Sequence, residues 1–313
     1  ADPVERTTLS SCRNMGAALA GMAINVLGPM IVFVDNKISA DRMFMTACVF
    51  GVLAISCYIG CYKLSTERIA VPVKEVEKGA FLRSVKSLLT NKPFLWVLAA
   101  SLLAMTNQFI VQAVNTYLFK DYFANAGALS IIGLVQTLAM FLVVPLVKPL
   151  VAKFGKKEIS VVGMTIASII YIVMFFLKFT TTTPFIVLAA LAYMAMCLYN
   201  IVTWAFITDV IDYHEYLTSM REDATVYSII SMSRKVGQAV AGGIGGVAIS
   251  MVGYDATVGT QSQDVLDGIY MLGTLVPGIF YAIIAVVLFI YPLSKQKTIQ
   301  LGKDLEARRN ANQ

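Results

Sequence analysis

The chain has 313 residues, of which 58% are hydrophobic and 14% are charged, and its mean hydropathy is +0.72. A soluble globular domain carries about 25% charged residues, so the composition excludes that class. The formal net charge is +6, but the basic residues are spread over the stretches between apolar runs. Such a distribution directs membrane topology and argues against a nucleic-acid-binding surface. The composition therefore predicts an all-α, polytopic protein embedded in a lipid bilayer.

Eight apolar runs follow one another along the chain, each close to the length of about 20 residues that a helix needs to cross a bilayer. They cover residues 13–34, 43–62, 94–118, 128–150, 158–178, 184–207, 225–251 and 269–292. Lys and Arg are concentrated after the second run, after the fourth run and in the C-terminal tail. The positive-inside rule assigns these stretches to the cytoplasm. We therefore expect a multi-pass protein of the cell inner (plasma) membrane, with both ends of the chain in the cytoplasm. A monomer is expected as well.

The apolar runs are unevenly divided, because two precede the first basic stretch and six follow it. Twelve-helix transporters place such a loop between two six-helix halves. The chain also begins with Ala1 instead of Met. We therefore expect an N-terminally truncated fragment that holds helices 5 to 12 of twelve. Its predicted parts are the last two helices of the N-terminal half (1–62), a central cytoplasmic loop (63–92), the C-terminal six-helix half (93–293) and a cytoplasmic tail (294–313).

The third run carries amide side chains at positions i, i+4 and i+7, which fall on one face of a helix: Gln108, Gln112 and Asn115. An amide in a membrane helix either faces a polar cavity or hydrogen-bonds a neighbouring helix. Both alternatives remain open at this stage. If the cavity is present, these amides are candidates to bind a solute.

The sixth run places Tyr193, Asn200 and Trp204 at i, i+7 and i+11, again on one helical face. An aromatic ring can stack on the apolar face of a pyranose while an amide hydrogen-bonds its hydroxyl groups. These three residues are therefore candidates to bind a sugar. The alternative is that the aromatic residues are packing or interfacial side chains, which are common in membrane helices.

The seventh run, 225–251, contains two adjacent cations, Arg234 and Lys235. Lys235 lies about 15 Å from the start of this run, near the bilayer midplane. A bare charge there costs about 3 kcal/mol, so it should face protein or a water-filled cavity. Groups that can bind a solute recur at i, i+4 and i+8: Tyr227, Ser231 and Lys235. This stripe predicts a solute pathway, with a buried ion pair as the alternative for Lys235 and a structural role for Arg234.

Two further patterns lie in and beside the seventh run. Gly242 and Gly246 have the GxxxG spacing, which predicts close packing against a neighbouring helix. The stretch before the run is dense in charge, and we expect it to be a cytoplasmic loop in which ion pairs close an inner gate or the side chains are solvated. The candidate gate residues are Asp209, Asp212, Glu215 and Arg221. His214, in the same stretch, is expected to be solvated.

The sequence TDVIDYHEYLTSMRED, followed by ATVYSIISMSRKVGQAVAGGIGG, resembles the signature of the glycoside-pentoside-hexuronide:cation symporter family. This is the melibiose-permease-like branch of the major facilitator superfamily. The family has an acidic pair, an aromatic residue, a Glu and an Arg before its eleventh helix, and a Lys and a Gly within that helix. The matching residues here are Asp209, Asp212, Tyr213, Glu215, Arg221, Lys235 and Gly237. The segments VERTTLSSCRNMGAALAG and NKPF are similar to the starts of helices 5 and 7 in the family.

The resemblance implies a major facilitator fold and cation-coupled symport of a sugar or glycoside by alternating access. It implies Na⁺ or H⁺ as the coupling ion, held mostly outside this chain, with no other cofactor and no metal site within it. It also implies that Lys235 stands beside the sugar and that Arg13 contacts the sugar from the N-terminal half. The simpler account of Arg13 is a side chain that snorkels to the cytoplasmic headgroups.

No enzymatic motif is present in the sequence. His214 is the single histidine, and the sequence has no nucleophile beside a base, no phosphate-binding Gly-rich loop and no metal-ligand spacing. We therefore expect a transporter and not an enzyme. The alternative function is a transporter-like membrane sensor or scaffold that moves no solute.

Overall fold

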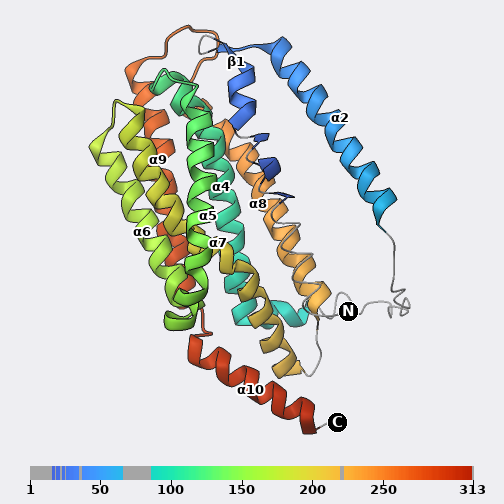
Figure 1. Cartoon of the computed structure of the whole chain (residues 1–313). Helices are drawn as coiled ribbons and strands as arrows, with labels where there is room; N and C mark the ends of the chain where they lie inside the picture. The colour runs from blue at the N-terminus through green and yellow to red at the C-terminus, as the bar shows by residue number, and fades with distance from the viewer. Residues whose placement is uncertain are drawn as a thin grey trace.

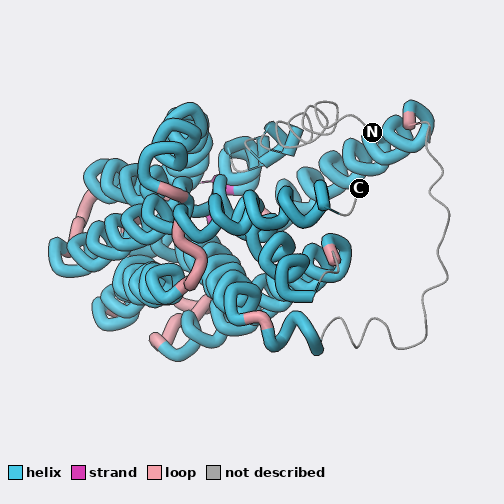
Figure 2. Tube along the Cα trace, turned by 90° about the horizontal axis from the view of Figure 1, so that it is seen from below, coloured by secondary structure: helices cyan, strands magenta, loops and turns pink. Residues whose placement is uncertain are grey.

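The computed structural model describes residues 16–34 except 18, 22 and 25, and then residues 37–65, 86–218 and 222–311. These residues are helical almost throughout (Figure 2). The exceptions are the turns and loops between helices and a short antiparallel pair, β1 (Phe33–Val34) and β2 (Lys37–Ile38). The helical elements are α2 (Ala40–Leu64), α4 (Lys92–Tyr117), the π-helical turn η1 (Leu118–Tyr122), α5 (Ala128–Phe154), α6 (Lys156–Leu177), α7 (Thr182–Thr218), α8 (Asp223–Met251), α9 (Gln263–Ile290) and α10 (Lys295–Ala311). The predicted all-α class is confirmed.

Six helices in the described part of the chain are long and apolar enough to cross a membrane: α2, α4 continued by η1, α5, α6, α7 and α9. Two of the eight predicted spans are not among them. The run 225–251 forms α8, which at 29 residues is about 43 Å long but is less apolar because it carries Arg234, Lys235 and several glycines. The run 13–34 falls partly outside the described residues.

The helices α4 to α9 lie side by side in one bundle (Figure 1). The most extensive packing joins α6 to α9 and to α7, while α4 packs against α8 and α9, and α5 packs against α7. Large side chains such as Tyr199, Phe206 and Tyr270 fill the space between these helices. The bundle therefore has a continuous apolar core, against which any polar side chain stands out.

Helix α2 is drawn apart from this bundle in Figure 1, and none of its residues is buried. Residues before α2 do reach the bundle, since the Ser130 hydroxyl of α5 donates to the Val26 carbonyl over 2.9 Å. The predicted central loop lies mostly outside the described residues, and α4 begins at Lys92. The predicted domain boundaries stay predictions.

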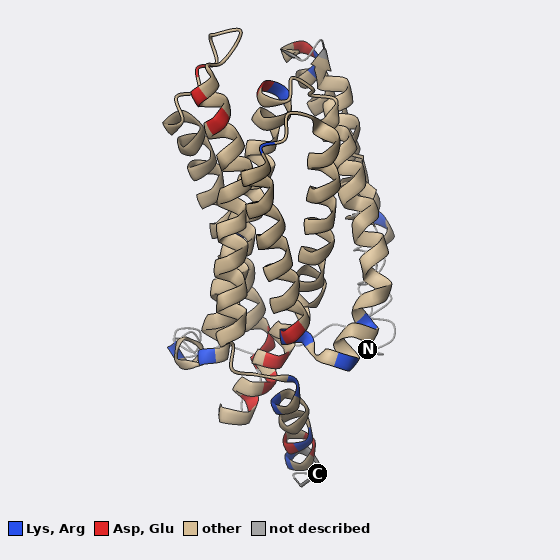
Figure 3. Cartoon of the chain, turned by 90° about the vertical axis from the view of Figure 1, so that its left-hand side faces the viewer, with Lys and Arg blue, Asp and Glu red and all other residues tan. Residues whose placement is uncertain are grey.

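Charged side chains gather at the two ends of the bundle, while most of its middle is free of them (Figure 3). The acidic stretch expected to be a loop is instead the last part of α7, which runs to Thr218. No Gly or Pro interrupts residues 208–218, and Val210 and Ile211 are buried. The prediction of a loop at 208–218 was therefore wrong, because apolar residues between the charges give this segment a packed helical face.

The close packing predicted from the GxxxG spacing is not seen among the described residues, where an added Cβ at Gly242 or Gly246 meets no atom within 4 Å. It stays a prediction. The glycines that meet α4 are Gly237 and Gly245, and a Cβ at Gly237 would lie 2.9 Å from the Leu102 carbonyl oxygen. Close packing of α8 on α4 therefore uses the face that carries Gly237 and Gly245.

Candidate solute-binding site

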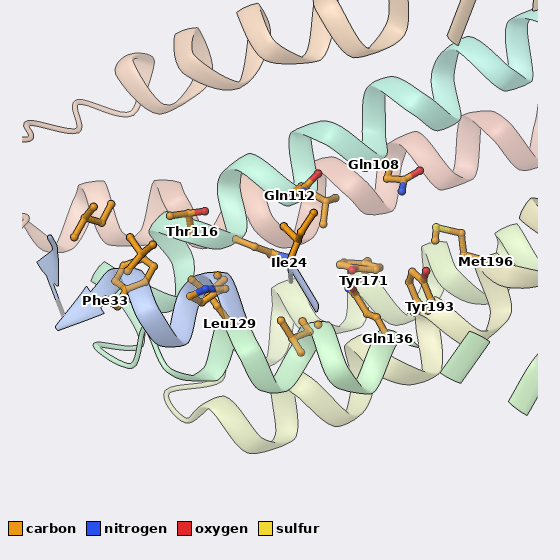
Figure 4. A pocket seen from close by; sticks show the side chains of 18 of the residues that line it. Ile24, Phe33, Gln108, Gln112, Thr116, Leu129, Gln136, Tyr171, Tyr193 and Met196 are labelled. Atoms are coloured by element: carbon orange, nitrogen blue, oxygen red, sulfur yellow. The ribbon is translucent and has the colours of Figure 1, made fainter. Parts of the chain in front are cut away.

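A cavity of about 440 Å³ lies between residues 24–43 and helices α4 to α7 and α9. The three amides predicted from the third run, Gln108, Gln112 and Asn115, all line it. Figure 4 shows Gln108 and Gln112 on α4, near Ile24 from the N-terminal segment. The amides therefore contribute to a polar cavity, which was one of the two alternatives that their spacing left open.

The opposite wall of the cavity carries side chains that sequence reasoning missed, namely Gln136 of α5, Tyr171 of α6 and Tyr281 of α9. The rings of Tyr171 and Tyr281 lie 5.5 Å apart, and the Tyr281 hydroxyl donates to the Met196 sulfur over 3.1 Å. The signal that could have found them is a polar or phenolic side chain in the middle of an apolar run. The cavity thus offers neutral hydrogen-bonding groups and aromatic surface, which suit hydroxylated solutes.

The predicted stripe on α8 is present as a face that the described part of the chain leaves open. Tyr227, Ser231 and Lys235 are all exposed, and the Lys235 ammonium donates to the Gln238 amide oxygen over 3.3 Å. None of these residues lines the cavity. The stripe is open because the glycine face of α8 is turned to α4.

Two of the three candidates from α7 belong to the cavity and to the stripe, and the third belongs to neither. Tyr193 lines the cavity, whereas Trp204 stacks on Tyr227 of α8, with ring centroids 6.0 Å apart and an interplanar angle of 25°. The guanidinium carbon of Arg234 lies 5.6 Å from the centre of the Trp204 ring. Asn200 lies between Tyr193 and Trp204 along α7. Its side chain is half-buried and does not line the cavity.

One end of the bundle holds an ion pair that involves a predicted gate residue. Asp209 of α7, only 6% exposed, accepts from the Lys156 ammonium of α6 over 2.6 Å. The next residue, Lys157, donates to the Tyr291 carbonyl after α9 over 2.6 Å. The first residues of α6, which follow the one-residue α5–α6 turn at Gly155 (φ 104°), therefore link α6 to α7 and to the end of α9.

Other predicted residues at this end have different outcomes. Asp212 and Glu215 lie further along α7, while Arg221 and Arg13 lie outside the described residues, so their roles stay predictions. His214 was expected to be solvated, but it is 1% exposed. It is enclosed because α7 stays helical through this stretch, and its Nε2 atom lies 3.9 Å from the Glu222 carboxylate.

These features define a multi-pass α-helical membrane protein with polar groups set inside an apolar bundle. Residues 1–295 match the model of the MFS/sugar transport protein family, so the chain belongs to that family. This confirms the expected relationship to sugar symporters of the major facilitator superfamily. The family consists of membrane transporters, which agrees with the prediction that the protein is not an enzyme.

Three relatives are similar over nearly the whole of this chain. An uncharacterized symporter, YjmB, of Bacillus subtilis (strain 168) is 29% identical over 97% of the chain and 66% of its own length. A glucuronide carrier protein homolog of Escherichia coli (strain K12) is 26% identical over 99% of the chain and 68% of its own length. An isoprimeverose transporter of Lactiplantibacillus pentosus is 26% identical over 98% of the chain and 64% of its own length. The chain thus spans about two thirds of the length of these relatives.

Proposed function

We propose that the protein is a secondary active transporter that moves a sugar or glycoside across the plasma membrane, coupled to Na⁺ or H⁺. The observation that carries the proposal is the open stripe on α8, where Lys235 stands among hydrogen-bonding side chains within an apolar bundle. A cation in the middle of a membrane helix is costly, and such cations mark solute or ion pathways. The family, and relatives named for a glucuronide and for isoprimeverose, support a sugar as the solute.

In this proposal the stripe and the cavity divide the recognition of the sugar. Lys235, Ser231 and Tyr227 hydrogen-bond hydroxyl groups, and Trp204 stacks on the apolar face of the sugar ring. The amides Gln108, Gln112 and Asn115, which line the cavity, hydrogen-bond a second group of hydroxyls. A monomer with one such pathway, opened alternately to each side, is sufficient for transport.

The ion pair between Lys156 and Asp209 is proposed to close the inner side of the pathway. It joins α6 to α7 at the end of the bundle that carries Lys153 of α5, Lys156 and Lys157 of α6 and the basic residues of α10. The positive-inside rule assigns that end to the cytoplasm. Breaking the pair would allow α6 and α7 to separate there and open the pathway inward.

Uptake by the complete protein in proteoliposomes tests the proposal. Labelled methyl glucosides, glucuronides and xylosides are supplied while an inward Na⁺ gradient or an inward H⁺ gradient is imposed. We expect at least one sugar to accumulate above its external concentration with one of the two gradients and to equilibrate without it. A folded protein that accumulates none of them with either gradient would contradict transport and favour a sensor or scaffold.

A further inference from the structure

Three lysines surround the one-residue turn between α5 and α6, and we call them the lysine cluster. Lys153 is the next-to-last residue of α5, Lys157 is the second residue of α6, and Lys295 is the first residue of α10. A Cβ at Gly155 would lie 2.9 Å from the Lys295 Cβ, so α10 begins directly beside the turn. The fold therefore brings positive charges from three helices to one place at the end of the bundle.

Backbone carbonyls hold two of these ammonium groups in position. The Lys295 ammonium donates to the carbonyls of Ala152 and Lys153 over 2.6 Å and 3.1 Å. The Lys157 ammonium donates to the Tyr291 carbonyl over 2.6 Å. Carbonyl oxygens carry no net charge, so these contacts fix the two nitrogen atoms and leave them positive. A side chain that is already ordered loses less entropy when it binds an anion.

Exposed aromatic rings lie beside the other ends of the cluster. The Lys153 ammonium is 5.2 Å from the centre of the Phe154 ring, and the Lys157 ammonium is 5.8 Å from the centre of the Phe289 ring. In the described part of the chain these rings are 50% and 70% exposed. They stand at the ends of α5 and α9, which are both long and apolar enough to cross a membrane. At such a position a ring meets lipid chains while a lysine reaches the headgroups.

The apolar surface continues from the cluster along α6 and α9. Figure 1 shows these two helices at the left of the bundle, whereas α2 lies at the right, beyond α8. Exposed apolar side chains follow one another on this side, with Val162 and Ile166 on α6 and Val286 on α9. Positive charge at the end of two apolar helices is complementary to a molecule with an anionic head and hydrocarbon chains.

We propose that the lysine cluster binds the phosphate of an anionic phospholipid whose chains lie along α6 and α9. The ammonium groups of Lys153, Lys157 and Lys295 contact the phosphate oxygens, and Phe154 and Phe289 contact the chains next to the headgroup. The positive-inside rule assigns this end of the bundle to the cytoplasm, and the cytoplasmic leaflet attracts basic segments through its anionic lipids. The inference goes beyond the proposed function and does not rest on it, because a lipid can bind whether or not a solute is moved.

The test counts lipids bound to the complete protein by native mass spectrometry in a neutral detergent. The probes are phosphatidylglycerol, which is anionic, and phosphatidylcholine with the same chains, which is zwitterionic. The unsubstituted protein should bind phosphatidylglycerol at least about 10-fold more tightly. Lys157→Gln and Lys295→Gln should each weaken phosphatidylglycerol by about fivefold, the contribution of one lysine at an anionic surface, and leave phosphatidylcholine within a factor of about two.

Lys303→Gln is the matched control, because it removes the same charge from an exposed position of α10, the helix that begins with Lys295. It should leave both affinities unchanged. Lys157→Arg keeps the charge and should keep most of the affinity for phosphatidylglycerol. If the variants at 157 and 295 do not fold without their carbonyl contacts, Lys153→Gln carries the comparison, because Lys153 is exposed.

Inorganic phosphate separates a lipid site from a general phosphate site. Millimolar phosphate, compared with chloride at equal ionic strength, should leave phosphatidylglycerol bound, since phosphate lacks the chains that contact Phe154 and Phe289. Phe289→Ala should weaken phosphatidylglycerol by about three- to tenfold through lost apolar contact.

Three results would overturn the inference. Equal affinity of the unsubstituted protein for the two lipids would mean that the cluster does not select an anion. Equal weakening of phosphatidylglycerol by Lys303→Gln and by the cluster variants would mean that the overall surface charge attracts the lipid. Displacement of phosphatidylglycerol by phosphate and not by chloride would mean that the cluster binds a free anion.

Discussion

The cavity beneath α4 and the stripe on α8 are both polar, but they differ in charge and in enclosure. The cavity is lined by amides and phenols, and its described lining residues include no Lys, Arg, Asp or Glu. The stripe carries the cation Lys235 on a face that the described part of the chain leaves open, and Arg234 is the preceding residue of α8. Neutral groups bind hydroxyls without a large desolvation penalty, whereas charges bind anions and respond to ions. The difference indicates that hydroxyl recognition and charge recognition are separated in space.

The largest expected effect comes from removing the charge of the stripe. Lys235→Ala should lower the rate of sugar uptake by about 100-fold, because a hydrogen bond from a charged group within a low-dielectric bundle is lost. Gln238→Ala removes the neutral partner of Lys235 and should lower uptake by about 10-fold or less. Lys303→Ala, on the exposed side of α10, is the control at equal expression. Equal uptake by the Lys235 and Lys303 variants would remove the stripe from the pathway.

A smaller effect is expected at the Lys156–Asp209 ion pair, which lies away from both polar regions. Asp209→Lys leaves two cations facing each other in a buried position, so uptake should fall by roughly 10-fold or more. The swap Lys156→Asp with Asp209→Lys restores opposite charges and should recover a large part of the rate. Initial uptake rates of the single and double variants measure the coupling between residues 156 and 209. A double variant as slow as the single ones would argue against a gate at this pair.

The packed face of α8 can be separated from its open face by two glycine variants. A Cβ at Gly237 meets the Leu102 carbonyl at 2.9 Å, whereas a Cβ at Gly242 meets nothing within 4 Å. Gly237→Ala should therefore lower the free energy of unfolding by about 1–3 kcal/mol through overpacking, whereas Gly242→Ala should raise it by up to about 1 kcal/mol through the higher helix propensity of alanine. Thermal melting in detergent compares them. Equal melting temperatures would mean that α8 does not pack on α4 through this face.

The smallest effect is expected for single amides of the cavity. Gln112→Leu and Asn115→Leu each remove a neutral hydrogen bond, which should raise the KM for sugar uptake by about 2- to 10-fold. Thr165→Leu is the control, because Thr165 is exposed on α6 and its hydroxyl donates to the Val161 carbonyl of its own helix. An unchanged KM in the double variant Gln112→Leu, Asn115→Leu would confine sugar recognition to the stripe.

The parts of the candidate site that follow from local periodicity could be predicted from the sequence. Tyr227, Ser231 and Lys235 share a face of α8 because their spacing follows the helical repeat. Gln136, Tyr171 and Tyr281 could not be grouped in this way, since three helices bring them together and no local pattern relates them. Six of the helix spans were predictable for the same reason as the stripe, because apolar length is a local property.

Where the structure differs from the sequence predictions, tertiary packing is the common physical cause. The charges at 208–218 suggested a loop, but Lys156 neutralises Asp209 and the intervening apolar residues are buried, so α7 continues. Gly237, Gly242, Gly245 and Gly246 all lie in α8, and only the neighbouring α4 determines which of them form the close contact. His214 is enclosed by the same extension of α7.

The central claim is that the open face of α8 binds the sugar, and protection from alkylation tests it directly. Ser231→Cys and Val247→Cys, both at exposed positions of α8 and about 24 Å apart along the helix, are placed singly in a cysteine-free form of the complete protein. A water-soluble maleimide is added with and without the sugar that the protein takes up. The account predicts that the sugar slows alkylation at position 231 and leaves position 247 unaffected. Alkylation at position 231 that is equally fast with and without saturating sugar would contradict it.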